Sequence, residues 1–178
     1  DPVAQAGDGG AKPARMAKAR MVMKDFKNRV DDLRETFAPT GKGVTFRLLM
    51  LLCTLLIMQC DHIDVNTAFL YADLVSPLYM NPPPGFPCRP GHCWKIVKAL
   101  YGCRTAPREW YKVLRLFVLS LGFMQTVLDP CLFYYGAGDL FMLIYFYVDD
   151  ILLFTKYGTD NGERLKKMFF DRFKCKDL

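Results

Sequence analysis

The 178-residue chain lacks the marks of several large protein classes. Its longest apolar run, residues 48–58, includes Thr54 and falls well short of the ~18–20 residues needed to span a bilayer, so the sequence predicts no membrane segment. Its seven cysteines include no CxxC spacing, which argues against a zinc ribbon, and their odd number argues against a disulfide framework. Residues 1–14 contain no apolar signal-peptide core. These absences predict an intracellular, cytoplasmic protein in a reducing compartment.

The composition excludes a disordered or collagen-like chain, because 52% of the residues are apolar and only 24% are charged. A chain of this length and composition can bury one sizeable core. We expect residues 1–17, which are rich in Gly, Ala and Pro, to form a loose lead-in, and residues 18–178 to form a single domain. The formal net charge of +6 favours a polyanionic partner without requiring one.

Three segments have the pattern of helices. Apolar side chains nearly encircle residues 44–60, which predicts a buried core helix. Residues 107–121 begin with a proline and carry one apolar stripe, as expected of an amphipathic helix that Gly122 can end. Asp160, with Glu163 three residues later, predicts the start of a last helix.

The remaining periodic segments have the pattern of strands. Residues 18–24 alternate basic and apolar side chains, and residues 62–65 form a second short candidate. Residues 131–135 and 140–148 predict one hairpin, and residues 151–154 continue from the latter into another. Helices mixed with hairpin-connected strands define the α+β class.

Two acids interrupt the apolar and aromatic stretch that surrounds them, namely Asp149 and Asp150 at the bend of the second hairpin. A solvated Asp-rich turn is the ordinary alternative. Asp64 follows another predicted strand, and if the strands are neighbours the three carboxylates converge and need a cation to neutralise them. Magnesium or manganese is the expected ion, and two such ions can clamp the oxygens of phosphoryl transfer. This is the chemistry of polymerases and nucleases.

Several segments resemble a known family. Tyr147-Val148-Asp149-Asp150 resembles the Y-x-D-D catalytic box of reverse transcriptases. Other segments resemble, in collinear order over residues 17 to 178, the boxes of copia-type LTR retrotransposon polymerases: Lys18-Ala19-Arg20-Met21-Val22-Met23-Lys24, Glu35-Thr36-Phe37-Ala38-Pro39, Asp64-Val65-Asn66-Thr67-Ala68-Phe69-Leu70, Leu78-Tyr79-Met80, Pro82-Pro83-Pro84-Gly85-Phe86, Leu100-Tyr101-Gly102, Ala106-Pro107-Arg108, Trp110-Tyr111 and Asp129-Pro130-Cys131-Leu132.

The resemblance implies an RNA-directed DNA polymerase: the palm of a right-hand fold plus partial fingers. In that family the primer 3′-OH attacks a dNTP with two Mg²⁺ (or Mn²⁺) ions present. Asp64 and Asp149 would be the principal metal ligands, and Asp150 a supporting acid. The implied partners are a nucleic acid template-primer, a dNTP and the other polyprotein portions. The family's pattern continues beyond both ends of this chain, into the rest of the fingers, the thumb and ribonuclease H.

The resemblance also implies nucleotide contacts. Phe69 would lie under the sugar of the incoming nucleotide and exclude a ribose 2′-OH, although an ordinary core Phe is the alternative. Lys18, Arg20 and Lys24 would face the triphosphate, with a solvated basic edge as the alternative. The residues implied to contact template, primer or nucleotide are Tyr101, Gly102, Arg104, Arg108, Tyr147 and Val148; the two arginines have a helix entrance as their other explanation.

The sequence departs from the family pattern at peripheral polar positions. Asp25 stands where the family has Gly, Asn66 where it usually has Lys, and Cys103 and Thr105 replace Leu and Gln. Two rival functions therefore stay open. One is a truncated, catalytically inactive retroelement remnant with at most weak nucleic-acid binding, and the other is a metal-dependent nuclease that uses the same acids. Whether the isolated chain is an enzyme is left open by the sequence.

Overall fold

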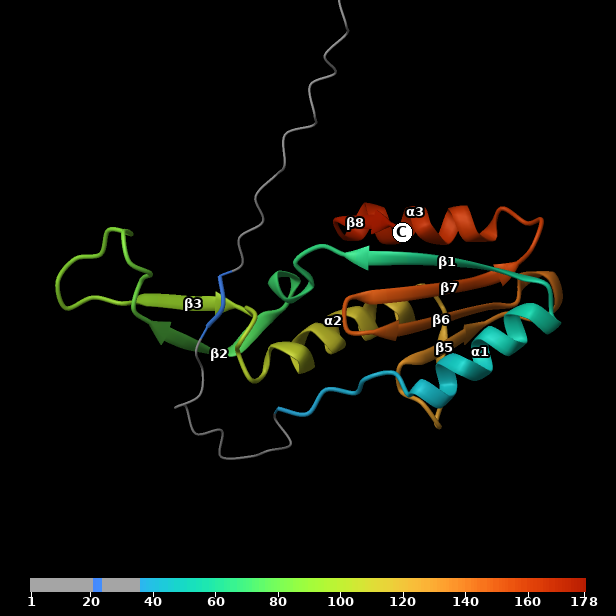
Figure 1. Ribbon diagram of the computed structural model, residues 1–178, viewed down its shortest axis with the longest axis horizontal. Helices are drawn as coiled ribbons and strands as arrows, with labels where there is room; N and C mark the ends of the chain where they lie inside the picture. The colour runs from blue at the N-terminus through green and yellow to red at the C-terminus, as the bar shows by residue number, and fades with distance from the viewer. Residues whose placement is uncertain (1–20, 24–35) are drawn as a thin grey trace, which may run out of the picture.

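The computed structural model describes residues 21–23 and 36–178 (Figure 1). The predicted lead-in over residues 1–17 lies outside these ranges. The predicted strand over residues 18–24, with its basic residues Lys18, Arg20 and Lys24, lies outside them except for residues 21–23, which are not assigned to a strand.

The described residues form helices and strands in mixed order. The helices are α1 (Gly43–Leu55), α2 (Ala106–Ser120) and α3 (Asn161–Arg172), with single 3₁₀ turns at η2 (Ala68–Tyr71) and η3 (Gly138–Leu140). The strands are β1 (Met58–Val65), β2 (Asp73–Met80), β3 (Trp94–Lys98), β4 (Met124–Gln125), β5 (Leu132–Tyr135), β6 (Met142–Tyr147), β7 (Asp150–Lys156) and β8 (Cys175–Asp177).

The main sheet has the strand order β4-β5-β6-β7-β1-β8, and every pairing within it is antiparallel. Both predicted hairpins are confirmed, since β5 pairs with β6 and β6 with β7. The second hairpin closes with Tyr147 opposite Asp150, so Val148 and Asp149 form its turn. β2 and β3 form a separate two-stranded hairpin that projects from the main sheet (Figure 1). The predicted α+β class is confirmed.

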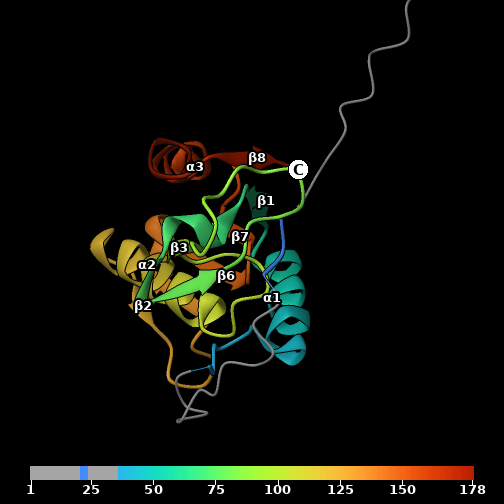
Figure 2. The same cartoon turned by 90° about the vertical axis from the view of Figure 1, so that its left-hand side faces the viewer.

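The main sheet is covered on both faces. α2 and α3 lie on one face and α1 lies on the other (Figure 2). The alternation along β7 divides its side chains between the two: Ile151 and Leu153 belong to the core with α2 and α3, whereas Phe154 packs with Leu49 of α1. A stripe on α2, including Trp110, supplies the larger core, as its amphipathic pattern predicts.

The prediction of a buried helix over residues 44–60 is wrong in two respects. The helix ends at Leu55, because residues 58–60 pair with β7 and Ile57 takes a left-handed φ of 49° where the chain reverses. It is also not encircled by protein. Leu49 is its only buried residue, while Leu48, Leu51 and Leu55 are exposed. The apolar run is therefore a half-covered helix followed by a strand.

The other helix predictions hold within a residue or two. α2 begins at Ala106 and Gly122 follows its end with a φ of 89°, and α3 begins directly after Asp160. Within the described ranges, no helix combines the length and the apolar character that crossing a membrane would require.

Candidate functional site

Two acids of the candidate site meet across the β1–β7 pairing. Asp64 near the end of β1 lies directly opposite Asp150, the first residue of β7. Asp149 precedes Asp150 in the turn, and its carbonyl oxygen accepts a hydrogen bond of 3.0 Å from the Val65 N–H. This bond ties the turn to β1 independently of side chains. Acids that are distant in sequence are therefore neighbours at one end of the sheet.

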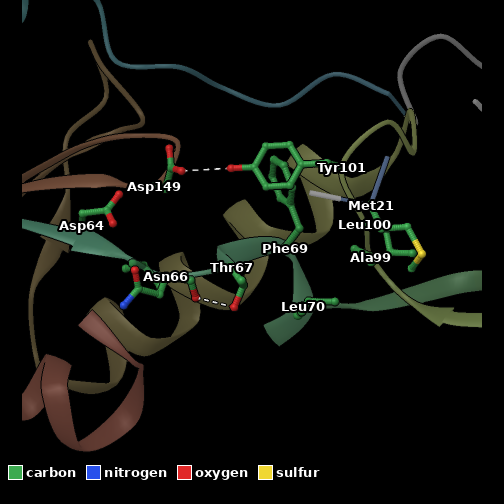
Figure 3. A pocket seen from close by; sticks show the side chains of 11 residues that line it. Met21, Asp64, Asn66, Thr67, Phe69, Leu70, Ala99, Leu100, Tyr101 and Asp149 are labelled. Carbon is green, nitrogen blue, oxygen red and sulfur yellow. Dashed lines mark hydrogen bonds between the residues drawn. The ribbon is translucent and has the colours of Figure 1, made fainter. Parts of the chain in front are cut away.

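Asp64 and Asp149 line the same cavity, whose volume is about 310 Å³ (Figure 3). The cavity lies between the end of β1, the turn η2 and the loop that follows β3. Both carboxylates are partly exposed. The residues lining it are Met21, Asp64, Val65, Asn66, Thr67, Phe69, Leu70, Ala99, Leu100, Tyr101 and Asp149.

Two aromatic residues form one side of this cavity. The Tyr101 hydroxyl donates a hydrogen bond of 3.1 Å to Oδ2 of Asp149. Its ring packs edge-on against Phe69, with 4.5 Å between ring centroids and 64° between planes. Phe69 is 6% exposed, so it belongs to the core as well as to the cavity wall. Phe69 is thus buried as the core alternative predicts, and its contact with a nucleotide sugar stays a prediction.

The backbone around the cavity is strained. Val148 and Thr67 adopt left-handed φ values of 62° and 54°, although both are β-branched. Such conformations cost roughly 1–3 kcal/mol each and persist only where the surroundings hold them. Trp110 helps to hold the Val148 backbone in this conformation, because its indole N–H donates a hydrogen bond of 2.7 Å to the Val148 carbonyl. In the sequence, Trp110 belongs to the apolar stripe of residues 107–121 and to the family-like Trp110-Tyr111 segment, and neither signal indicates this hydrogen bond.

Asp150 has different surroundings from Asp64 and Asp149. Its Oδ1 lies 2.9 Å from Nε2 of His62, and the two side chains border another cavity, on the α1 face, with Tyr147. Sequence reasoning did not single out His62. The alternation along β1 puts it on the same face as Asp64, which is the signal that identifies it.

Among the residues that the structure describes, no group of three or more acidic, histidine or cysteine side chains has an arrangement able to hold a metal ion.

The pair Asp64 and Asp149 nevertheless fits a hard divalent cation. Its donors are carboxylate oxygens, and Mg²⁺ is usually held by one or two carboxylates together with substrate phosphates and water. Cys175 is nearby but does not line this cavity, and burial and, to a lesser extent, the Asp64 carboxylate raise the pKa of its thiol to about 11. The residues present are thus suited to magnesium or manganese completed by a phosphate ligand.

The other residues predicted to contact template, primer or nucleotide do not line the carboxylate cavity. Gly102 and Val148 line a second, more open cavity behind the Phe69–Tyr101 pair, whereas Tyr147 borders the cavity of Asp150. Arg104 is exposed and Arg108 is half-buried in the first turn of α2, and neither lines the carboxylate cavity. Lys18, Arg20 and Lys24 lie outside the described residues.

The fold and the cavity together define a class: an α+β protein whose antiparallel sheet carries a pair of carboxylates of the donor type that divalent cations prefer. Comparison with known proteins makes the class specific. The family described as reverse transcriptase (RNA-dependent DNA polymerase) matches residues 9–178. The chain therefore belongs to the reverse transcriptase family, and the resemblance to copia-type retrotransposon polymerases is confirmed.

Curated relatives show which reverse transcriptases are similar. The chain is 40% identical over 139 residues to the retrovirus-related Pol polyprotein from transposon RE1 of Arabidopsis thaliana, a match covering 76% of this chain and 10% of the relative. It is 35% identical over 177 residues to the Pol polyprotein from transposon TNT 1-94 of Nicotiana tabacum, covering 96% and 13%. The chain thus spans only about a tenth of these relatives. No solved structure matches significantly.

Proposed function

We propose that this chain is the palm, with part of the fingers, of a right-hand RNA-directed DNA polymerase, and that residues 18–178 form one domain. In the proposed reaction the primer 3′-hydroxyl attacks the α-phosphate of a dNTP and pyrophosphate leaves. The observation that carries the proposal is that Asp64 and Asp149 line one cavity. Family membership supports it, because the relatives are Pol polyproteins of transposons.

In this proposal Asp64 and Asp149 hold a divalent cation, and Asp150 supports them from the neighbouring strand position. When bound, a pair of Mg²⁺ or Mn²⁺ ions neutralises the carboxylates and stabilises charge on the oxygens of phosphoryl transfer. The protein's part is to bring the two carboxylates together on a rigid sheet. The tie from Val65 to Asp149 and the Trp110 contact to Val148 fix the turn before substrate arrives.

The nucleotide would enter the carboxylate cavity with its sugar against Phe69. A buried ring held by Tyr101 cannot move aside easily, so its bulk favours a deoxyribose over a ribose. Lys18, Arg20 and Lys24 are the proposed cations for the triphosphate. The proposed contacts to template, primer or nucleotide are Tyr101, Gly102, Arg104, Arg108, Tyr147 and Val148. The template-primer and the remaining polyprotein portions are the proposed partners.

Primer extension tests the proposal directly. The chain is incubated with an RNA template, a DNA primer, dNTPs and Mg²⁺, and compared with Asp149→Asn and with Asp171→Asn, which changes an exposed acid of α3 in the same way. We expect extension by the parent and by Asp171→Asn but none by Asp149→Asn. Equal extension by all three would remove Asp149 from the mechanism.

The same assay separates the two rival functions. Salt-dependent binding of the template-primer without any extension indicates an inactive remnant, since phosphate contacts release counterions whether or not chemistry follows. Shortening of labelled nucleic acid in the absence of dNTPs indicates a nuclease.

A further inference from the structure

Tyr101 joins three segments that are far apart in the chain. Its carbonyl oxygen accepts a hydrogen bond of 2.8 Å from the Met23 N–H. Its ring packs against Phe69, and its hydroxyl donates to Asp149 (Figure 3). Gly102, the next residue, lies so close to Met23 that a Cβ there would come within 1.9 Å of the Met23 carbonyl oxygen. Contacts with Met23 thus hold the backbone at Tyr101 and Gly102, and the contact with Phe69 holds the Tyr101 ring.

We propose, on the basis of the proposed function, that Tyr101 is a positioning residue for Asp149. By donating a hydrogen bond to Oδ2, its hydroxyl restricts the last side-chain torsion of Asp149. The carboxylate is therefore already oriented toward the cavity when a divalent cation binds. Tyr101 itself need not touch the cation.

The physical reason is the freedom that an Asp carboxylate has without such a partner. Its last torsion joins a tetrahedral and a planar carbon, and it is broad rather than confined to staggered wells. Asp149 is partly exposed and sits in a turn, so packing alone restricts this torsion weakly. Hydrogen-bond partners of ligating carboxylates typically contribute 10–100-fold to metal affinity. Tyr101 is suited to this task because its ring is already fixed by Phe69.

The opposite effect is also physically possible, which makes the inference testable by its sign. A hydroxyl that donates to a carboxylate oxygen competes with any cation that needs the same oxygen. If competition dominated, removal of the hydroxyl would strengthen metal binding. If positioning dominates, as we propose, removal weakens it.

The test is Mn²⁺ binding to the full chain, measured by the electron paramagnetic resonance signal of unbound Mn²⁺. Tyr101→Phe keeps the ring and removes the hydroxyl, and we expect it to bind Mn²⁺ about 10-fold more weakly than the parent. The matched control is Tyr111→Phe, which removes a hydroxyl that donates a hydrogen bond of 2.9 Å to the Pro130 carbonyl, away from the carboxylate cavity. It should bind like the parent.

A mutant cycle separates this inference from the proposed function. Asp149→Asn should weaken Mn²⁺ binding, and adding Tyr101→Phe to it should cause no further loss. If Asp149→Asn itself has no effect, the proposed function fails. If Asp149→Asn weakens binding while Tyr101→Phe leaves it unchanged or strengthens it, only the role of Tyr101 is overturned. Additive losses would likewise overturn it, because Tyr101 would then act elsewhere.

A second variant guards against a purely structural effect. Tyr101→Leu removes the ring along with the hydroxyl and should lose the same affinity as Tyr101→Phe, with folding of both checked by circular dichroism. A silent Tyr101→Phe together with a weakened Tyr101→Leu would assign the effect to ring packing and contradict the proposal.

Discussion

The close approach of Gly102 to Met23 predicts an unusually costly glycine substitution. Gly102 has a φ of 91°, and an added Cβ would lie 1.9 Å from the Met23 carbonyl oxygen, a backbone atom. Gly85 has nearly the same φ, 89°, but nothing lies within 4 Å of its Cβ position. Gly102→Ala and Gly85→Ala therefore share the backbone strain of a left-handed alanine, and only the first adds a collision.

The extra cost follows from what must move. Met23 is 4% exposed and donates a hydrogen bond to the Tyr101 carbonyl. Displacing it loses about 0.5–1.5 kcal/mol for the hydrogen bond and about 1.5–3 kcal/mol for the buried side chain. Gly102→Ala should thus lower the free energy of unfolding by about 2–4.5 kcal/mol more than Gly85→Ala does.

The assay is urea unfolding followed by circular dichroism, with the parent and both variants measured side by side. Equal losses for the two variants, within about 0.5 kcal/mol, would refute the reasoning. They would mean that residues 21–23 do not pack against Gly102 in solution.

Three further predictions concern other parts of the fold. Lys166→Met should lower the free energy of unfolding by about 3 kcal/mol in urea titrations, because the Asp61 carboxylate would lose its counter-charge. That carboxylate is 11% exposed and lies 3.1 Å from the Lys166 ammonium. An unchanged urea midpoint would contradict this. Phe169→Ala should cost about 3–5 kcal/mol in the same titrations, since its ring is fully buried, and a loss below 1 kcal/mol would contradict it. Alkylation by iodoacetamide at pH 8, measured by mass spectrometry, should be slow at Cys175 and fast at exposed Cys88. The reason is that a pKa raised to about 11 keeps the Cys175 thiol protonated until the pH approaches 11. Equal alkylation rates would contradict this.

The sequence predicted those parts of the fold that local patterns determine. The stripe on residues 107–121 and the turn residues of the two hairpins carry their own signals, and the structure has them where they were expected. The helix over residues 44–60 was misjudged because an apolar run shows neither where a helix ends nor which of its sides is covered. Both depend on β7, whose pairing with residues 58–60 is a contact distant in sequence.

The candidate site was predictable to a similar extent. Motifs singled out Asp64, Asp149, Phe69 and Tyr101, and all four line one cavity. Motifs contain no information on side-chain partners, and the hydrogen bond of Tyr101 to Asp149 follows only from the packing of the loop after β3. The pairing of Asp150 with His62 likewise depends on the β1–β7 register, which a single sequence does not specify.

The most direct test of the central claim, that Asp64 and Asp149 share one divalent cation, is an anomalous-scattering measurement on crystals of the chain soaked in MnCl₂ with a dNTP. The account predicts a manganese peak within coordination distance of both carboxylates, and loss of that peak in Asp149→Asn crystals. The account is contradicted if manganese binds only between Asp150 and His62. It is equally contradicted if the carboxylates of Asp64 and Asp149 point away from each other with no manganese between them.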